Sequence, residues 1–122
     1  MKKKILIIED NEDIRMLYKR MFRKEKMIEI SAVESGEEAL RIIPDFKPDL
    51  LFVDISLPGI SGLELTRKVS QEYPSVKILV VTGHEVIRYY DEAINSGADD
   101  LVSKEIGKDI LIKCRKLLQI QD

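Results

Sequence analysis

Two kinds of hydrophobic spacing alternate along the chain. Short, largely apolar runs rich in β-branched residues are typical of strands that are buried on both faces of a sheet. Five such runs occur, at residues 4–8, 28–33, 49–53, 77–81 and 100–102. Each is followed by a segment whose apolar residues recur at helical spacing. This alternation predicts an α/β fold in which βα units surround a parallel sheet.

Capping and stop residues delimit the helices. Ser35 with Glu38, and Ser61 with Glu64, have the spacing of capping boxes and predict two helix starts. Pro44 predicts that the second helix ends before it. The first helix is expected over about 12–24, with a core face made of Ile14, Leu17, Tyr18, Met21 and Phe22.

Composition and charge exclude several classes of protein. The 122 residues are 44% hydrophobic and 34% charged, which is typical of one globular domain spanning 1–122. Twenty basic and 22 acidic residues give a net charge of -2, so we expect no direct binding of nucleic acid and no membrane association. No segment approaches membrane-spanning length. The single cysteine, Cys114, cannot form an internal disulfide and suits a reducing, cytoplasmic location.

Polar and charged residues stand where four of the predicted strands end. Glu9 and Asp10 follow the first strand, Asp54 the third, Thr82 the fourth and Lys104 the fifth. Each alone is explained as a cap or a surface residue, but the carboxyl ends of parallel strands meet at one edge of a sheet. Three carboxylates there need a cation, and Mg²⁺ prefers such oxygen ligands. With a metal ion neutralising its charge, Asp54 is a candidate carboxylate nucleophile toward a phosphoryl group.

These residues make the chain resemble the response regulator receiver family, the phosphoacceptor half of two-component signalling. The resemblance extends from about Lys4 to Leu118. It rests on Glu9-Asp10, Asp54, the turn Leu57-Pro58-Gly59 with Gly62, Thr82, Gly97-Ala98-Asp99 and Lys104. It implies a doubly wound, CheY-like (flavodoxin-like) fold, a three-layer sandwich with a five-stranded parallel sheet in order 2-1-3-4-5. It also implies either a single-domain regulator or a receiver cut from a longer one.

The resemblance assigns a role to each residue of this edge. It implies that Asp54 accepts phosphate from a histidine kinase or phosphotransfer protein, and that Thr82 and Lys104 hold the phosphate. Phosphorylation would then change the surface of helix 4, strand 5 and helix 5, which controls an output domain or downstream protein or forms a homodimer. The implied ligands of Mg²⁺ are Asp10, Asp54, the backbone carbonyl of Ser56 and, through water, Glu9.

Four positions bear on tuning, switching and the shape of the loop after the lysine. In the family, positions such as Ser56 and His84 flank the phosphoryl site and set how fast it hydrolyses; an exposed loop histidine is an equal alternative for His84. Leu101 stands where receivers usually carry an aromatic switch residue, and Glu105 where proline often follows the lysine in a cis bond. A cis peptide before a non-proline residue is strongly disfavoured, so we expect a differently shaped loop. The leucine bears on the switching step, not on the phosphorylation chemistry.

Three other functions compete with the phosphorylated switch. An aspartate-nucleophile phosphohydrolase uses a second carboxylate two residues after the nucleophile, where this chain has Ser56. A flavin or nucleotide module needs a glycine- or hydroxyl-rich phosphate loop, where this chain has the acidic run 9–13. The third alternative is an interaction module that has the receiver fold but does not use phosphate. Leu101 and Glu105 support it, whereas the intact acidic residues at the strand ends argue against it.

A basic run follows the first strand. It consists of Arg15, Lys19, Arg20, Arg23, Lys24 and Lys26. The run is either a docking face for an acidic partner or a solvated helix face, and its pattern favours the second interpretation.

Overall fold

The computed structural model describes residues 2–83, 86–104 and 107–120. The described residues form one five-stranded sheet in the order β2-β1-β3-β4-β5, with every neighbouring pair parallel. The strands are β1 (Lys3–Ile8), β2 (Ile28–Val33), β3 (Leu50–Asp54), β4 (Lys77–Thr82) and β5 (Asp100–Ser103). The predicted strand order is therefore confirmed, with several strand ends displaced by one residue.

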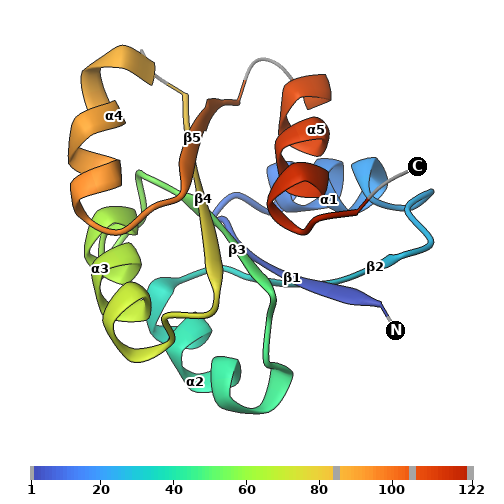
Figure 1. The fold of residues 1–122 in the computed structure, drawn as a ribbon, viewed down its shortest axis with the longest axis horizontal. Helices are drawn as coiled ribbons and strands as arrows, with labels where there is room; N and C mark the ends of the chain where they lie inside the picture. The colour runs from blue at the N-terminus through green and yellow to red at the C-terminus, as the bar shows by residue number, and fades with distance from the viewer. Residues whose placement is uncertain (1, 84–85, 105–106, 121–122) are drawn as a thin grey trace.

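Helices cover both faces of the sheet and make it the middle layer of three. Figure 1 shows α1 and α5 on one side of the strands and α2, α3 and α4 on the other. The helices are α1 (Glu12–Met21), α2 (Gly36–Phe46), α3 (Gly62–Glu72), α4 (Val86–Asn95) and α5 (Gly107–Leu117). In the part of the chain that the structure describes, no helix is long and apolar enough to cross a membrane.

The sheet separates two hydrophobic clusters, and β3 shows why the strands read as continuous apolar runs. Leu51 and Val53 pack with the α2–α3–α4 layer, whereas Leu50 and Phe52 pack with the α1–α5 layer. All five residues of β3 are buried. Since side chains alternate between the faces of a strand, a strand that is covered on both faces has no polar face.

The helix starts follow the predicted caps. The Ser35 Oγ accepts a hydrogen bond from Glu38 N at 3.1 Å, and the Ser61 Oγ accepts one from Glu64 N at 3.1 Å. Asn11 caps α1, because its Oδ1 accepts a hydrogen bond from Ile14 N at 3.1 Å. Each contact satisfies one of the backbone N–H groups that the first turn of a helix leaves without a partner.

The first helix departs from its predicted length and face. It ends at Met21 rather than near residue 24, and a turn leads from Phe22 into β2. Leu17 was predicted to face the core but is 56% exposed. The buried face is centred on Tyr18 and Phe22, and Leu17 lies at its margin because successive residues are separated by about 100°.

Pro44 does not end the second helix. It lies inside α2, which continues to Phe46 and ends at Lys47 in a left-handed conformation with φ of 54°. Ile43 is buried, Phe46 packs against the same cluster, and Lys47 N still donates to Ile43 O at 2.9 Å. The apolar packing of this last turn offsets the single hydrogen bond that a proline removes.

Candidate functional site

The strand register brings the ends of four strands together at one edge of the sheet. Ile8 of β1 is level with Val53 of β3, and Asp54 is level with Val81 of β4. Thr82 is level with Ser103 of β5. Asp54 and Thr82 are therefore the last residues of their strands rather than the first residues beyond them.

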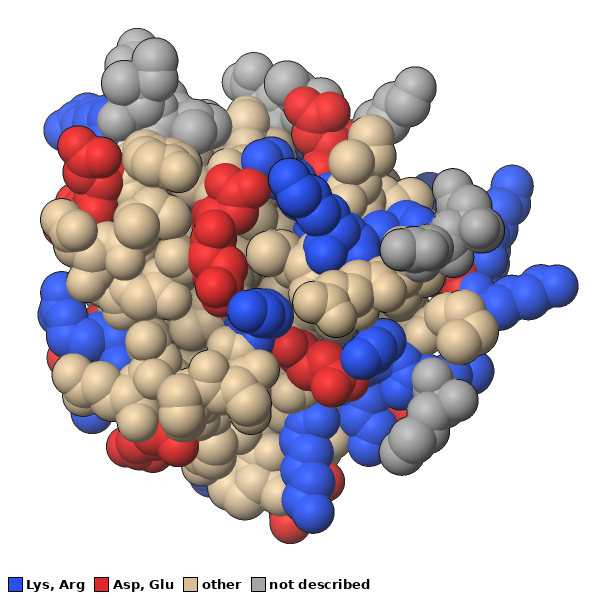
Figure 2. All heavy atoms as spheres, in the orientation of Figure 1, with Lys and Arg blue, Asp and Glu red and all other residues tan. Residues whose placement is uncertain are grey.

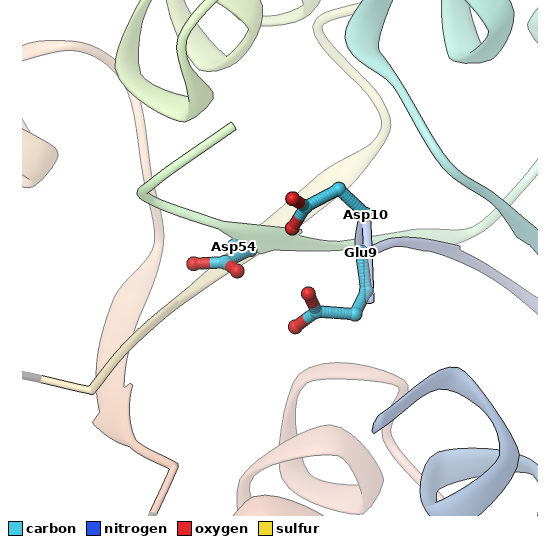
Figure 3. Close-up of side chains that lie close together, drawn as sticks. All are labelled: Glu9, Asp10 and Asp54. Carbon is cyan, nitrogen blue, oxygen red and sulfur yellow. The ribbon is translucent and has the colours of Figure 1, made fainter. Parts of the chain in front are cut away.

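Three carboxylates converge at this edge, as the sequence predicts. Figure 3 shows the side chains of Glu9, Asp10 and Asp54 around one small space next to the end of β3. One ligand oxygen from each lies within 4.8 Å of the others. Glu9 is 1% exposed and Asp54 5% exposed, whereas Asp10 is exposed. Two of the three charges are thus held in a largely desolvated position, where repulsion between them is strong.

Lys104 lies between the two buried carboxylates. Its Nζ is 2.7 Å from Asp54 Oδ2 and 3.0 Å from Glu9 Oε1. Its backbone N donates to the carbonyl oxygen of Thr82 at 2.9 Å, which anchors the residue beside the end of β4. Burial alone would lower the pKa of the lysine, but the hydrogen bonds and charges of Asp54 and Glu9 outweigh it, so the pKa is raised. The lysine is therefore a cation at neutral pH.

Glu9 is the least satisfied group of the site. Its Oε2 accepts a hydrogen bond from Asn11 N at 3.1 Å. Its Oε1 is buried and, among the described residues, has no hydrogen bond of good geometry besides the close charge contact with Lys104. Burial raises the pKa of Glu9 despite the opposing effects of Asn11 and Lys104, and the nearby charge of Asp54 raises it further.

This donor set fits a small divalent cation. The three carboxylates carry more negative charge than Lys104 neutralises, and Glu9 Oε1 is a buried oxygen that still lacks a well-placed hydrogen. Hard cations such as Mg²⁺ are bound by carboxylate and carbonyl oxygens with several waters retained. Ser56 lies next to the cluster, because its backbone N donates to Asp54 Oδ1 at 3.0 Å.

The remaining predicted residues are placed as follows. Thr82 is fully buried at the end of β4. Leu101 of β5 is buried and packs in the cluster of the α2–α3–α4 layer, level with Val80. His84 and Glu105 lie outside the described residues.

Arg15 of α1 contacts the site, whereas Tyr18 of the same helix packs in the core layer of α1 and α5. The Nη1 of Arg15 donates to the carbonyl oxygen of Glu9 at 2.7 Å and so holds the backbone after β1. The ring of Tyr18 packs edge-on against Phe52, with 4.8 Å between ring centroids. Burial raises the pKa of Tyr18, and the charges of Glu9 and Asp54 raise it further. Nothing local in the sequence links either residue to a strand end, because Arg15 belongs to the basic run and Tyr18 to the apolar face of the helix.

Comparisons with known proteins agree with this geometry. The family model described as the response regulator receiver domain matches residues 5–115. The transcriptional regulatory protein DegU of Brevibacillus brevis is 35% identical over 115 residues, which are 93% of this chain and 49% of that protein. The response regulator GacA of Pseudomonas aeruginosa is 30% identical over 111 residues, 90% of this chain and 52% of that protein. The chain thus spans about half the length of these relatives.

Solved structures resemble the chain over nearly its whole length. A CheY-like response regulator receiver domain protein from Methanospirillum hungatei JF-1 has a TM-score of 0.88 and 30% identity, covering 98% of this chain and 97% of that one. A putative response regulator from Chloroflexus aurantiacus J-10-fl has a TM-score of 0.90 and 27% identity, covering 98% and 99%. The fold is therefore CheY-like and flavodoxin-like.

Proposed function

Because the chain belongs to the response regulator receiver family, we propose that Asp54 is the phosphoacceptor of a two-component system. The observation that carries the proposal is the placement of the Lys104 ammonium 2.7 Å from Asp54 Oδ2, with Glu9 and Asp10 beside it. A carboxylate nucleophile needs charge stabilisation on the phosphoryl oxygens, and this edge concentrates the groups that supply it.

Each residue of the edge has a role in the transfer. An Asp54 oxygen attacks the phosphorus of a phosphohistidine on a histidine kinase or phosphotransfer protein; the new P–O bond forms as the P–N bond breaks. Lys104 moves from the carboxylate to the phosphoryl oxygens, and the Thr82 hydroxyl donates a hydrogen bond to one of them. Asp10, Asp54 and the Ser56 carbonyl, with Glu9 acting through water, would hold Mg²⁺, which would neutralise the charge that accumulates there.

The proposed output is a change of the surface formed by α4, β5 and α5. Thr82 ends β4 two residues after Val80, and Val80 is level with Leu101 on β5. If Thr82 shifts toward the phosphate, the space between these strands and α4 changes, and Leu101 can repack within it. This couples a local charge to a two-state surface, which controls an output domain or downstream protein or forms a phosphorylation-dependent homodimer.

The chain then acts as a signalling phosphoprotein and not as a metabolic enzyme. It catalyses only its own phosphorylation and dephosphorylation, in the cytoplasm, as one receiver domain over 1–122. Ser56 supports this assignment against a phosphohydrolase, because it is a hydroxyl residue where such an enzyme places a second carboxylate. In the two relatives compared, roughly half of the protein lies beyond the matched region, so an output domain in a longer form is part of the proposal.

One observation favours a second candidate, an interaction module that does not use phosphate. Leu101 is already buried in the cluster beside α4, so no exposed aromatic ring is available to turn inward at this position. In that case the surface of α4, β5 and α5 would be constant, and Asp54 would have no regulatory role.

Intact mass after incubation with acetyl phosphate and Mg²⁺ separates the two candidates. We expect one phosphoryl group on the wild type, none on Asp54→Asn, and none on the wild type when EDTA is present. The matched control is Asp45→Asn, an exposed carboxyl of α2, which should be phosphorylated normally. An unmodified wild type that also fails to bind beryllofluoride would contradict the phosphoacceptor and favour the constant module.

A further inference from the structure

A second concave region lies near the amino ends of the strands, at the opposite end of the sheet from Asp54. It is a groove of about 730 Å³ between the C-terminal half of α1, the turn that follows and the start of β2. Ile28, which begins β2, is level with Lys3, which begins β1. Because all strands are parallel, this groove opens at their amino ends, whereas Asp54 stands at their carboxyl ends. The groove is therefore separate from the phosphoacceptor site.

Positive charge is concentrated around this groove. Its exposed cationic side chains are Lys2, Lys19, Arg20, Arg23 and Lys26. The acidic side chain in its lining is Glu25, which is already ion-paired with Arg115 of α5. Figure 2 shows Lys and Arg side chains projecting from the side of the molecule where α1 and β2 lie in Figure 1. Since the whole chain carries a net charge of -2, this is a local concentration and not a general property of the surface.

Apolar surface accompanies these cations. Met16, which lines the groove, is 53% exposed, and Met27, directly before β2, is 50% exposed. With Leu17, they are three of the five large hydrophobic side chains that are exposed among the described residues, and all three belong to the segment from α1 to β2. The buried Phe22 and Ile28 line the groove together with Met16. An exposed apolar side chain within a groove that has a charged border, with further exposed apolar side chains in the same segment, indicates a protein-binding surface.

We propose that this groove binds an acidic, amphipathic segment of a separate partner protein. The cations would pair with Asp or Glu side chains of the segment, and one or two apolar anchors would contact Met16 and the floor of the groove. Helix-in-groove recognition has this combination of apolar anchors and complementary charge. This inference concerns a different surface from the proposed phosphotransfer and does not depend on it.

Other anionic occupants fit the surface less well. Nucleic acid is bound mainly through its phosphates, which need cations but no exposed methionines. A second copy of this chain has acidic side chains near Asp10, but that contact would be head-to-tail, and such contacts form open assemblies unless they close into a ring. A partner protein with acidic and apolar side chains uses both properties of the groove.

The test is fluorescence anisotropy with a labelled synthetic peptide that has Leu at helical spacing and Glu between the Leu positions. We expect binding that weakens as salt is raised, because exposed ion pairs are screened. A peptide of the same composition with the Leu spacing scrambled should bind at least about tenfold more weakly, since its apolar anchors no longer share one face.

Charge-reversed variants locate the binding surface. The double variant K19E/R23E should lower peptide affinity by roughly tenfold or more, whereas R41E/K68E, on exposed positions of α2 and α3, should bind as the wild type does. Met16→Ser tests the apolar contribution and should also weaken binding. Phosphorylation of Asp54 by acetyl phosphate should be the same in all three variants, and circular dichroism shows whether each is folded.

Several results would overturn the proposal. One is equal affinity for the scrambled peptide. Another is that neither K19E/R23E nor Met16→Ser changes the affinity for the peptide. A third is tighter binding to duplex DNA, or to vesicles containing an anionic lipid, than to the peptide. Self-association that disappears in K19E/R23E, measured by sedimentation, would instead assign the surface to contacts between copies of this chain. If K19E/R23E does not fold, the single variants R20Q and K26Q with Met16→Ser decide the question.

Discussion

The sheet has a carboxyl edge, where the strands end, and an amino edge, where they begin. Charged side chains gather at both edges, but they are buried at the first and exposed at the second. At the carboxyl edge, Glu9 and Asp54 are almost completely buried and share the ammonium of Lys104, which is 23% exposed. At the amino edge, the cations of the groove are exposed and stand beside apolar side chains. Buried charges are fixed in place and interact strongly, which suits a small ligand and a reaction at one atom. Exposed charges interact weakly one by one, which suits a large partner with many contacts.

Among the substitutions at these two ends of the sheet, the largest effect on stability is expected from Lys104→Met. Removing the ammonium leaves two buried carboxylates without their shared cation, and breaking such a pair costs several kcal/mol when it is fully buried. Because the lysine is partly exposed, we expect the free energy of unfolding in EDTA to fall by about 2 kcal/mol. Mg²⁺ should restore most of this loss, since it supplies the missing positive charge. Urea unfolding with and without Mg²⁺ measures both values.

Lys113→Met is the matched control for that variant. Its Nζ is 2.6 Å from Asp100 Oδ2, but this carboxylate is 28% exposed, whereas Glu9 and Asp54 are almost completely buried, so the pair is worth less than about 1 kcal/mol. Mg²⁺ should make no difference to this variant. If the two lysine variants lose equal stability, or if Mg²⁺ does not help Lys104→Met, burial does not set the strength of the carboxyl-edge ion pair.

A second prediction concerns the core layer between the two edges, where α1 and α5 cover the sheet. Cys114 is completely buried, and burial raises the pKa of its thiol to about 12. The thiol ionises in the unfolded chain near pH 8.5, so the native state holds more protons above that pH. The thiol should therefore not affect the free energy of unfolding below about pH 8.5. Above that pH, the free energy of unfolding should fall by up to roughly 1.4 kcal/mol per pH unit as the pH rises toward 12. Tyr18, whose pKa is also raised by burial, should add to the fall at higher pH.

Urea unfolding of wild type and Cys114→Ala at pH 8 and pH 10 measures this slope. The variant should be less stable at pH 8 because a buried side chain is shortened, but it should lose less stability on going to pH 10. A thiol reagent at pH 8 should react with Cys114 only when the chain is unfolded. Identical slopes for the two proteins would show that the thiol is not protected in the native state.

The sequence predicted the carboxyl edge well because its signals are local. β3 is an apolar run that ends in a carboxylate, and all five of its residues are buried. A strand of this kind can be recognised without knowledge of its neighbours. Family resemblance supplied the strand order, and the register then brought Glu9, Asp10 and Asp54 together.

What the sequence could not predict depends on contacts between distant segments. Nothing near Glu9 indicates that Lys104 pairs with it directly, or that Arg15 holds its carbonyl oxygen. Pro44 stays inside α2 because Ile43 and Phe46 pack against the core, and packing overrides a local stop signal. Leu17 satisfies helical spacing but lies at the margin of the face that the sheet covers.

The smallest effect on stability is expected from the charge-reversed groove variant. The sequence favoured a solvated helix face for the basic run, and the fold adds the observation that Met16 and Met27 are exposed in the same α1-to-β2 segment. Because Lys19 and Arg23 are exposed and surface charges contribute little, K19E/R23E should change the free energy of unfolding by less than about 0.5 kcal/mol. Reducing the crowding of like charge can even stabilise the variant slightly. A loss of 2 kcal/mol or so, as large as that of Lys104→Met, would mean that these cations hold the fold together and would remove the distinction between the two edges.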